Sequence, residues 1–259
     1  MNVKFRMPRF GQMLSGKSML RELLMTTLGT TISIVLTFGT AAWLDHRKQE
    51  KNRRQTAMMV LSNIEDFAQN MRYLDSTLVA CGSTLTRIAE LPRDSVLRLN
   101  EKESDAFLRA VFGSVLLQRD KTAENIFTND ISTWREVGNM RFISSVGECY
   151  SFINDIEKNY RVQLDRKNEL RQRFIEELDY EKMTGGECVA AILDMKGAKL
   201  FIDDFTGGFI PYFESSIDAL LRFNDNNMAL IGVTREELVE FVKAEEKRDI
   251  NTLQSETRF

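Results

Sequence analysis

A stretch of 22 residues without a charged side chain, Leu23–Leu44, constrains this chain more than any other feature. As an α-helix rising about 1.5 Å per residue, the stretch is about 33 Å long, enough to cross a hydrocarbon core of about 30 Å. A cleaved signal peptide is the alternative, but signal peptides have apolar cores of only about 7–15 residues. The sequence therefore predicts an uncleaved transmembrane helix that holds the protein in the lipid bilayer by a single span.

Residues that break helices are scarce along the chain. Only 3 Pro and 14 Gly occur in 259 residues, while 43% of the residues are hydrophobic and 28% are charged. Such a composition is typical of long helices rather than of many short strands. We therefore expect an all-α protein with one N-terminal transmembrane helix that continues into a stalk and a helical bundle. The expected parts are a basic N-terminal tail at 1–22, the transmembrane helix at 23–44, a polar stalk at 45–56, the bundle at 57–247 and a polar C-terminal tail at 248–259.

The charges are divided unevenly along the chain. Residues 1–54 carry ten Lys/Arg and three Asp/Glu, whereas residues 55–259 carry 25 Lys/Arg and 35 Asp/Glu. Basic residues near a membrane are attracted to anionic headgroups by about 1 kcal/mol each. The acidic remainder argues against nucleic acid as a partner, because binding to phosphates depends on basic side chains.

The same charges bear on the orientation of the predicted span. Five Lys/Arg precede it and five follow within ten residues, so the positive-inside rule nearly cancels. A short basic tail is hard to translocate, whereas long domains cross largely regardless of their charge. We expect the N-terminus in the cytoplasm and residues 45–259 outside the inner membrane.

Hydroxyl side chains line one face of the predicted span. Thr26, Thr30, Ser33, Thr37 and Thr40 follow one another at alternating steps of four and three residues. Such hydroxyls can bond the carbonyls of their own helix, and they can also allow two helices to pack closely. The second interpretation makes this face a candidate surface for a homo-oligomer.

Apolar residues recur at steps of three and four from Ala57 to Ile88. A parallel dimeric coiled coil would need a narrow seam flanked by pairing charges. Instead, Leu61 and Ala68 broaden the stripe, and uncharged polar residues stand at flanking positions. The pattern predicts a helix that packs within its own bundle and ends before Pro92.

Similar patterns predict the later helices. The expected ranges are 103–117, 129–137, 145–183, 187–205, 212–229 and a last helix that opens at Thr234. Thr128 is the expected N-cap of the helix at 129–137, and Gly138 its stop. Thr206-Gly207-Gly208 is expected to form a turn, and Thr234 with Glu237 a capping box.

The segment Gly11–Ser18, GQMLSGKS, matches the phosphate-binding loop pattern GxxxxGK[ST]. That loop works between a buried strand and a soluble helix, with an acidic strand end nearby for magnesium. Here the preceding residues include Lys4, Arg6 and Pro8, and the helix that follows is the predicted span. No α/β domain has room to form, so we expect no nucleotide and no other cofactor.

Other residues that could carry chemistry are few. The only histidine, His46, lies at the predicted membrane edge, so a histidine-dependent triad or a multi-histidine metal site is excluded. The acidic pairs Asp203-Asp204 and Glu236-Glu237 are typical of solvated helix faces. Trp134 is typical of an aromatic packed where helices meet. The sequence therefore predicts no catalytic residue and no metal ligand.

The chain has three cysteines, Cys81, Cys149 and Cys188, and no two of them form a CxxC motif. Each is expected to behave as a small buried hydrophobe. A single Cys149–Cys188 bridge stays open as an alternative if the body reaches an oxidising compartment.

Two tracts carry a resemblance to a known family. One is the basic tail with Leu14-x-x-Lys17, followed by the span and at once by a polar stalk. The other is the tract at 133–143, TWREVGNMRFI, with an aromatic residue, Gly-Asn-Met and an isoleucine. Over about residues 4–60 and 126–160 the chain resembles a family of uncharacterised single-span bacterial membrane proteins with a helical domain of unknown function. The Gly-Glu pair usual early in that family's span is Gly29-Thr30 here. The resemblance implies an architecture and no activity.

By elimination of chemistry, the expected function is that of a non-enzymatic, membrane-anchored helical scaffold or interaction protein with an unknown protein partner. Two alternatives stay open. A membrane-tethered sensory module would need a ligand that shifts the bundle. A carboxylate-based hydrolase would need Asp/Glu side chains that face each other in a cleft.

Overall fold

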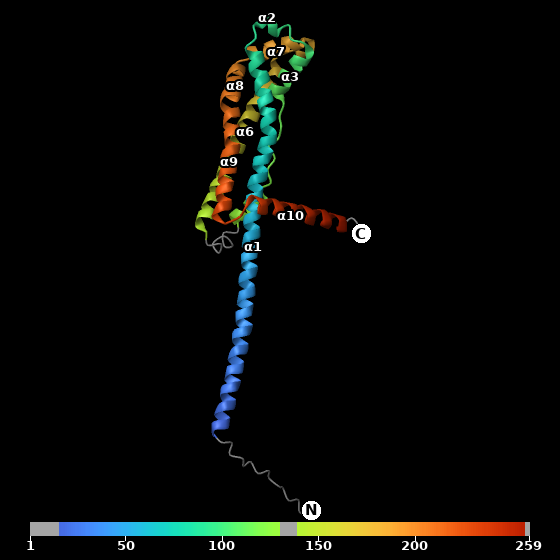
Figure 1. Ribbon diagram of the computed structural model, residues 1–259. Coiled ribbons are helices and arrows are strands. Elements are labelled where there is room, and N and C mark those ends of the chain that lie inside the picture. The colour runs from blue at the N-terminus through green and yellow to red at the C-terminus, as the bar shows by residue number, and fades with distance from the viewer. Residues whose placement is uncertain (1–15, 130–138, 257–259) are drawn as a thin grey trace, which may run out of the picture. The chain divides into compact units, whose positions relative to one another are not determined.

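The computed structural model describes the backbone of residues 16–129 and 139–256, and the side chains from His46 to Lys247 except those at 130–138 and 245–246. Within this part of the chain every regular element is a helix and none is a strand, so the expected all-α class is confirmed (Figure 1). The α-helices are α1 (Gly16–Ala89), α2 (Arg93–Val96), α3 (Glu101–Phe112), α4 (Thr122–Asn129), α6 (Met140–Glu177), α7 (Gly185–Asp194), α8 (Ala198–Asp204), α9 (Ile210–Leu230) and α10 (Arg235–Glu256). A 3-10 turn, Tyr180–Lys182, precedes α7, and a π-helical turn, Phe205–Phe209, joins α8 to α9.

The chain divides into two compact units, Met1–Arg54 and Gln55–Phe259. In the first unit the backbone is helical from Gly16 onward. The expected span at 23–44, its hydroxyl stripe and the loop-like pattern Gly11–Ser18 all fall outside the residues whose side chains are described. Among the residues that are described, no helix is both long enough and apolar enough to cross a bilayer. The transmembrane assignment therefore stays a prediction.

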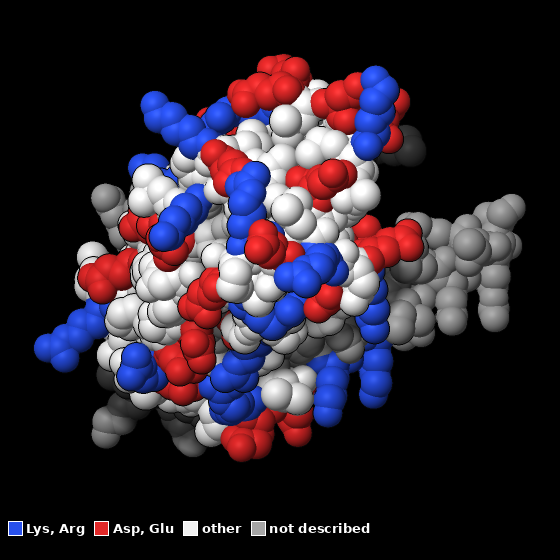
Figure 2. Space-filling view, turned by 90° about the horizontal axis from the view of Figure 1, so that it is seen from above, with Lys and Arg blue, Asp and Glu red and all other residues white. Residues whose placement is uncertain are grey.

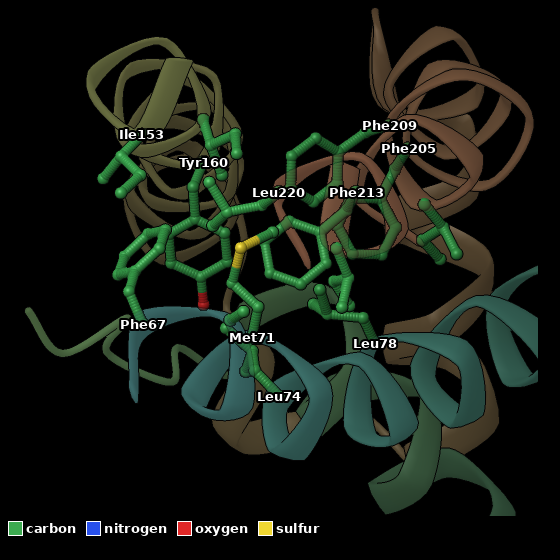
Figure 3. Close-up of a cluster of buried hydrophobic side chains, with 14 of the residues drawn as sticks. Phe67, Met71, Leu74, Leu78, Ile153, Tyr160, Phe205, Phe209, Phe213 and Leu220 are labelled. Carbon is green, nitrogen blue, oxygen red and sulfur yellow. The ribbon is translucent and has the colours of Figure 1, made fainter. Parts of the chain in front are cut away.

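The second unit is a bundle around one hydrophobic core. Three runs of helix supply most of it, namely α1 from Ala57 onward, α6, and α8 with α9. Figure 3 shows a cluster built from Phe67, Met71, Leu74 and Leu78 of α1, Ile153 and Tyr160 of α6, and Phe205, Phe209, Phe213 and Leu220. Because α1 also buries Leu61 and Ala68, the expected packing of a broad apolar stripe within the bundle is confirmed.

The long helices α6 and α9 are antiparallel. Asn139 caps the start of α6 by accepting a hydrogen bond from the amide of Phe142 (3.1 Å), and it donates to the carbonyl of Leu230 at the end of α9 (2.8 Å). Farther along, Asn159 of α6 donates to the hydroxyl of Tyr212, near the start of α9 (3.2 Å). The asparagine of the Gly-Asn-Met tract thus joins two helix ends.

The region before α9 differs from the sequence prediction at two places. The expected single helix at 187–205 is broken, because Gly197 adopts a φ of 90°, which a glycine tolerates without a Cβ penalty. The expected turn at Thr206-Gly207-Gly208 is wrong, since a π-helical turn carries the helix through both glycines. The reason is packing. Four rings one helical turn apart stack with centroids 5.5–5.7 Å from one another, namely Phe201, Phe205, Phe209 and Phe213.

α4 was not expected. Thr128, the predicted N-cap of a helix at 129–137, lies inside α4, where its hydroxyl donates to the carbonyl of Glu124 (2.9 Å). Thr128 is therefore inside a helix and not at an N-cap, whereas the predicted helix at 129–137 lies outside the described residues from 130 onward. Residues 130–138, with Trp134 and the expected stop at Gly138, lie outside the described part of the chain.

The last helix begins as predicted. The Glu237 amide donates to the hydroxyl of Thr234 (3.3 Å), and the Thr234 amide donates to the Glu237 carboxylate (3.0 Å). The predicted capping box is therefore confirmed. α10 continues to Glu256, so the backbone of most of the expected C-terminal tail is helical.

All three cysteines are free thiols, and the bridge left open between Cys149 and Cys188 does not form. Cys149 and Cys188 are buried and Cys81 is half-buried, as expected of small hydrophobes. Burial raises the pKa of the Cys149 thiol to about 11, so this group is unreactive at neutral pH.

Candidate functional site

An extended segment at residues 113–121 joins α3 to α4, and we name it the strap. α3 was expected to reach Leu117, but it ends at Phe112, and the backbone at position 113 is extended (φ −67°, ψ 137°). The reason lies on another helix. The buried ammonium group of Lys167, on α6, donates to the carbonyls of Ala110 (2.8 Å) and Gly113 (3.2 Å) and so caps α3 from outside.

Side chains of two other helices hold the rest of the strap. Tyr160 of α6 donates its hydroxyl to the carbonyl of Val115. Asn63 of α1 donates to the carbonyl of Asp120 (3.0 Å) and accepts from the hydroxyl of Tyr150 (3.3 Å). The strap therefore depends on tertiary contacts for its position, because its backbone belongs to no helix or sheet.

Arg119, near the end of the strap, is the centre of a buried polar cluster. Its side chain is only 2% exposed. One terminal nitrogen donates to Asn154 (2.8 Å) and Glu157 (2.7 Å), and the other donates to Glu124. Asn154 closes the cluster by donating to Glu124 (3.1 Å). We name these four residues the Arg119 hub.

The hub is paired well enough to hold a charge inside the protein. Moving an ion from water into a protein costs on the order of several kcal/mol, unless opposite charges and hydrogen bonds compensate the lost hydration. Here the carboxylates of Glu124 and Glu157 flank the guanidinium, and the rings of Phe67 and Tyr150 each lie 5.9 Å from it. The Arg119 Nε has no hydrogen-bond partner. The hub thus anchors the strap to α4 and α6 and leaves one donor of Arg119 unused.

A groove of about 810 Å³ opens beside the hub. Its walls are α1, the strap with the start of α4, and α10. The lining consists of Gln55, Thr56, Met59, Ser62, Asn63, Asp66, Phe67, Asn70, Arg119, Asp120, Thr122, Ala123, Phe241 and Val242. Sites for small molecules are mostly apolar and enclosing. An open groove rich in amides and hydroxyls is better suited to a segment of polypeptide.

Among the residues whose side chains are described, carboxylates outnumber cations in this groove and in the hub beside it. The carboxylates of the groove and hub are those of Asp66, Asp120, Glu124 and Glu157. The cations are Arg119 and Lys121, whose ammonium lies 3.8 Å from Glu157. Hydrogen bonds from the side chain and the amide of Thr122 hold the pKa of Asp120 below its usual value. Asp120 is therefore charged at neutral pH.

The end of the bundle that carries α2 and α7 has no such excess. Figure 2 looks onto this end, where the described Lys and Arg side chains are mixed with Asp and Glu. The ion pair between Arg93 of α2 and Asp194 of α7 is more than half exposed, and such pairs contribute about 0–1 kcal/mol. A phosphate-rich partner would need a basic patch instead.

None of the residues singled out from the sequence lines the groove, within the described part of the chain. His46 is an exposed residue of the first unit. Of the acidic pairs, Asp204 pairs with Arg166, and Glu237 serves the capping box of α10. These carboxylates have structural or solvated roles.

Two interacting carboxylates do occur between α1 and α9. Burial first, and the charge of Glu214 second, raise the pKa of Asp75. One oxygen of Asp75 is buried without a hydrogen-bond partner. A carboxylate-based hydrolase would need such a pair beside a substrate, but neither residue lines the groove. The pair is not part of the candidate site.

Sequence reasoning missed Arg119 and Lys167. Each is one of 35 Lys/Arg in the chain, and no local pattern separates a buried cation from an exposed one. Their partners lie on other elements: Glu157 is 38 residues from Arg119, and Gly113 is 54 residues from Lys167. Only tertiary contacts distinguish these two side chains.

No protein-family model, curated protein or solved structure matches this chain. Among the described residues, no group of His, Cys, Asp or Glu is arranged to hold a metal ion. The interpretation of the site therefore depends on its own geometry and charge.

Proposed function

We propose that this protein is a membrane-anchored, non-enzymatic helical interaction protein that binds a partner protein in the groove between α1, the strap and α10. The observation that carries the proposal is the groove itself, with about 810 Å³ of open space and a mixed lining that includes six amide or hydroxyl side chains. Such groups can bond a polypeptide at many positions. The neighbouring guanidinium is already paired with two carboxylates and is not poised to transfer a proton.

In this proposal the anchor is the uncharged stretch Leu23–Leu44, and its hydroxyl stripe from Thr26 to Thr40 is a face for self-association. The double variant Ile34→Arg/Val35→Arg tests the anchor, since each charge costs about 2.5–3.5 kcal/mol at a helix centre. We expect this variant to move from the membrane fraction to the soluble fraction, while Ile34→Ala/Val35→Ala stays. Retention of the arginine variant through carbonate washing would contradict the anchor.

The orientation belongs to the same proposal, with the N-terminal tail in the cytoplasm and residues 45–259 outside the inner membrane. Protease added to spheroplasts should digest the body and leave a cytoplasmic marker intact. Full protection of the body would reverse the orientation.

Photo-crosslinking tests the groove directly. Benzoylphenylalanine is placed at Ser62 or Asn70, which line the groove, or at Leu200 on α8 as a control that is 73% exposed. In native membranes we expect one discrete cross-linked product from both groove positions and none from the control. The same products from all three positions, or none from the groove, would refute the proposed function.

A further inference from the structure

The joint between α9 and α10 is built so that each helix is capped by its own residues. The amides of Gly232 and Val233 donate back to the carbonyls of Ala229 (3.3 Å) and Met228 (3.0 Å), which is the Schellman ending of α9. The capping box of Thr234 then starts α10 within its own first turn. Gly232 is exposed at a φ of 63°, and a Cβ there would contact no described atom within 4 Å. A glycine without neighbours changes its backbone angles at little cost, so this joint can act as a hinge.

Few contacts hold α10 on the bundle. Among residues 235–244, whose side chains are described, only Leu238 is buried. Arg235 adds ion pairs with Glu65 of α1 (2.8 Å) and with Asp225 of α9, but its side chain is 46% exposed, and exposed pairs contribute little to stability. By contrast, α9 has buried side chains along its whole length. The packing of α10 on the bundle is therefore much weaker than that of α9.

α10 is also one wall of the groove. Its half-buried residues Phe241 and Val242 supply part of the apolar lining. The other walls, α1 and the strap, are held by the hydrophobic core and by the Arg119 hub. Figure 1 shows α10 pointing away from α6 and α9, so only the part near its start meets the bundle. The groove is therefore complete only while that part of α10 is docked.

We propose that α10 is a hinged wall of the groove, which docks and undocks about Gly232 while the rest of the bundle stays folded, and that only the docked state binds the partner. The inference rests on the proposed function and adds the regulation of that site. A site that is complete in a fraction of the molecules binds with an affinity reduced by that fraction. A substitution that loosens α10 should therefore weaken partner binding without unfolding the bundle.

Hydrogen exchange of the full chain in lipid nanodiscs tests the hinge. α10 has 22 residues, and a helix of this length is marginally stable in water without packing, so its amides exchange when it undocks. We expect the protection of the amides of Phe241 and Val242 to be at least about 100-fold lower than that of amides in the middle of α9. Equal protection of α10 and α9 would overturn the hinge.

Leu238→Ala removes the one buried side chain that docks the described part of α10. Loss of a buried leucine corresponds to a factor of about 30 in an equilibrium constant. Exchange of Phe241 and Val242 should rise by about that factor, while α9 keeps its protection. Val239→Ala, at the neighbouring side chain that is 46% exposed, is the matched control and should leave exchange unchanged. Faster exchange of α9 in Leu238→Ala would place α10 in one cooperative unit with the bundle and overturn the hinge.

Photo-crosslinking from Ser62 in native membranes tests the regulation. Leu238→Ala should lower the yield of the discrete product about tenfold, and Val239→Ala should keep the yield of the parent. An unchanged or higher yield in Leu238→Ala would mean that the groove binds without docked α10, which overturns the regulation. Absence of the product from the parent would refute the proposed function itself, whereas hydrogen exchange would still decide whether α10 is hinged.

Discussion

The strap and the helical run from α8 to α9 lie on the same core but satisfy their backbones differently. From Ala198 to Leu230 the backbone bonds within the helix, and four phenylalanine rings stack along one face. We name these rings, Phe201, Phe205, Phe209 and Phe213, the aromatic ladder. The strap has no such internal bonding, and its carbonyls accept from side chains of α1 and α6.

Two residues of α6 join these regions. The ring of Tyr160 lies 6.0 Å from Phe209 and from Phe213, and its hydroxyl bonds the strap. The ammonium of Lys167 lies 4.8 Å from the ring of Phe205 and also bonds the strap. The position of the strap therefore depends on the ladder, whereas the ladder does not depend on the strap. We expect substitutions in the ladder to disturb the strap, and substitutions in the strap to leave the ladder folded.

The largest effect is expected from Phe213→Ala, because this ring is fully buried in the ladder. Loss of a buried phenylalanine and the resulting cavity cost about 3–5 kcal/mol. We expect that loss in the free energy of unfolding by urea titration, together with faster amide exchange in the ladder. Phe223→Ala, at a ring that is 41% exposed, is the control and should cost far less. Equal losses would contradict a core centred on the ladder.

Arg119→Met should come next. Removal of one partner of a buried ion pair leaves the others uncompensated, and the partial exposure of Glu124 and Glu157 reduces the cost to about 2–4 kcal/mol. Amide exchange should rise in α4, which follows the strap, with protection of the ladder retained. Arg93→Met, which removes an exposed pair, should cost less than about 1 kcal/mol. A loss of ladder protection in Arg119→Met would refute the direction of dependence.

Lys167→Met tests the link between the two regions. The methionine keeps the buried apolar stem but leaves the carbonyls of Ala110 and Gly113 without their donor. Two lost hydrogen bonds, partly offset by relief of a buried charge, should destabilise the fold by about 1–2 kcal/mol. Lys121→Met, at a side chain that is 58% exposed, is the matched control. A stability equal to that of the parent would mean that burying the ammonium costs as much as its bonds contribute.

The smallest effect concerns alkaline pH. Burial raises the pKa of Cys149 to about 11 and that of Tyr160 to about 12, above the ordinary values of 9.0 and 10.0. The folded state therefore keeps these groups neutral where the unfolded chain ionises them, so stability is full below about pH 9 and falls toward pH 11. We expect a loss of about 1 kcal/mol between pH 9 and 10 by urea titration. Cys149→Ala should flatten this dependence, and an unchanged slope would exclude the thiol as its source.

Local sequence was sufficient for several elements of the fold. The broad apolar stripe from Ala57 to Ile88 predicted the buried face of α1, and the Thr234–Glu237 pair predicted the start of α10. These features depend on residues within one or two helical turns, where side-chain spacing and backbone capping act directly. The uncharged stretch Leu23–Leu44 is a local feature of the same kind, and its membrane role stays a prediction.

Tertiary structure alone decided where α3 ends, how α8 continues into α9 and which cation is buried. The apolar periodicity predicted that α3 extends to Leu117. Instead, Lys167, which is 54 residues from Gly113, caps the helix earlier. Two glycines predicted a turn, yet stacking of rings on both sides keeps the backbone helical. The sequence does not distinguish Arg119 from other arginines, because its partners Glu124, Asn154 and Glu157 surround it only in the folded chain. In each case the deciding free energy comes from groups far apart in the chain, which a local pattern does not contain.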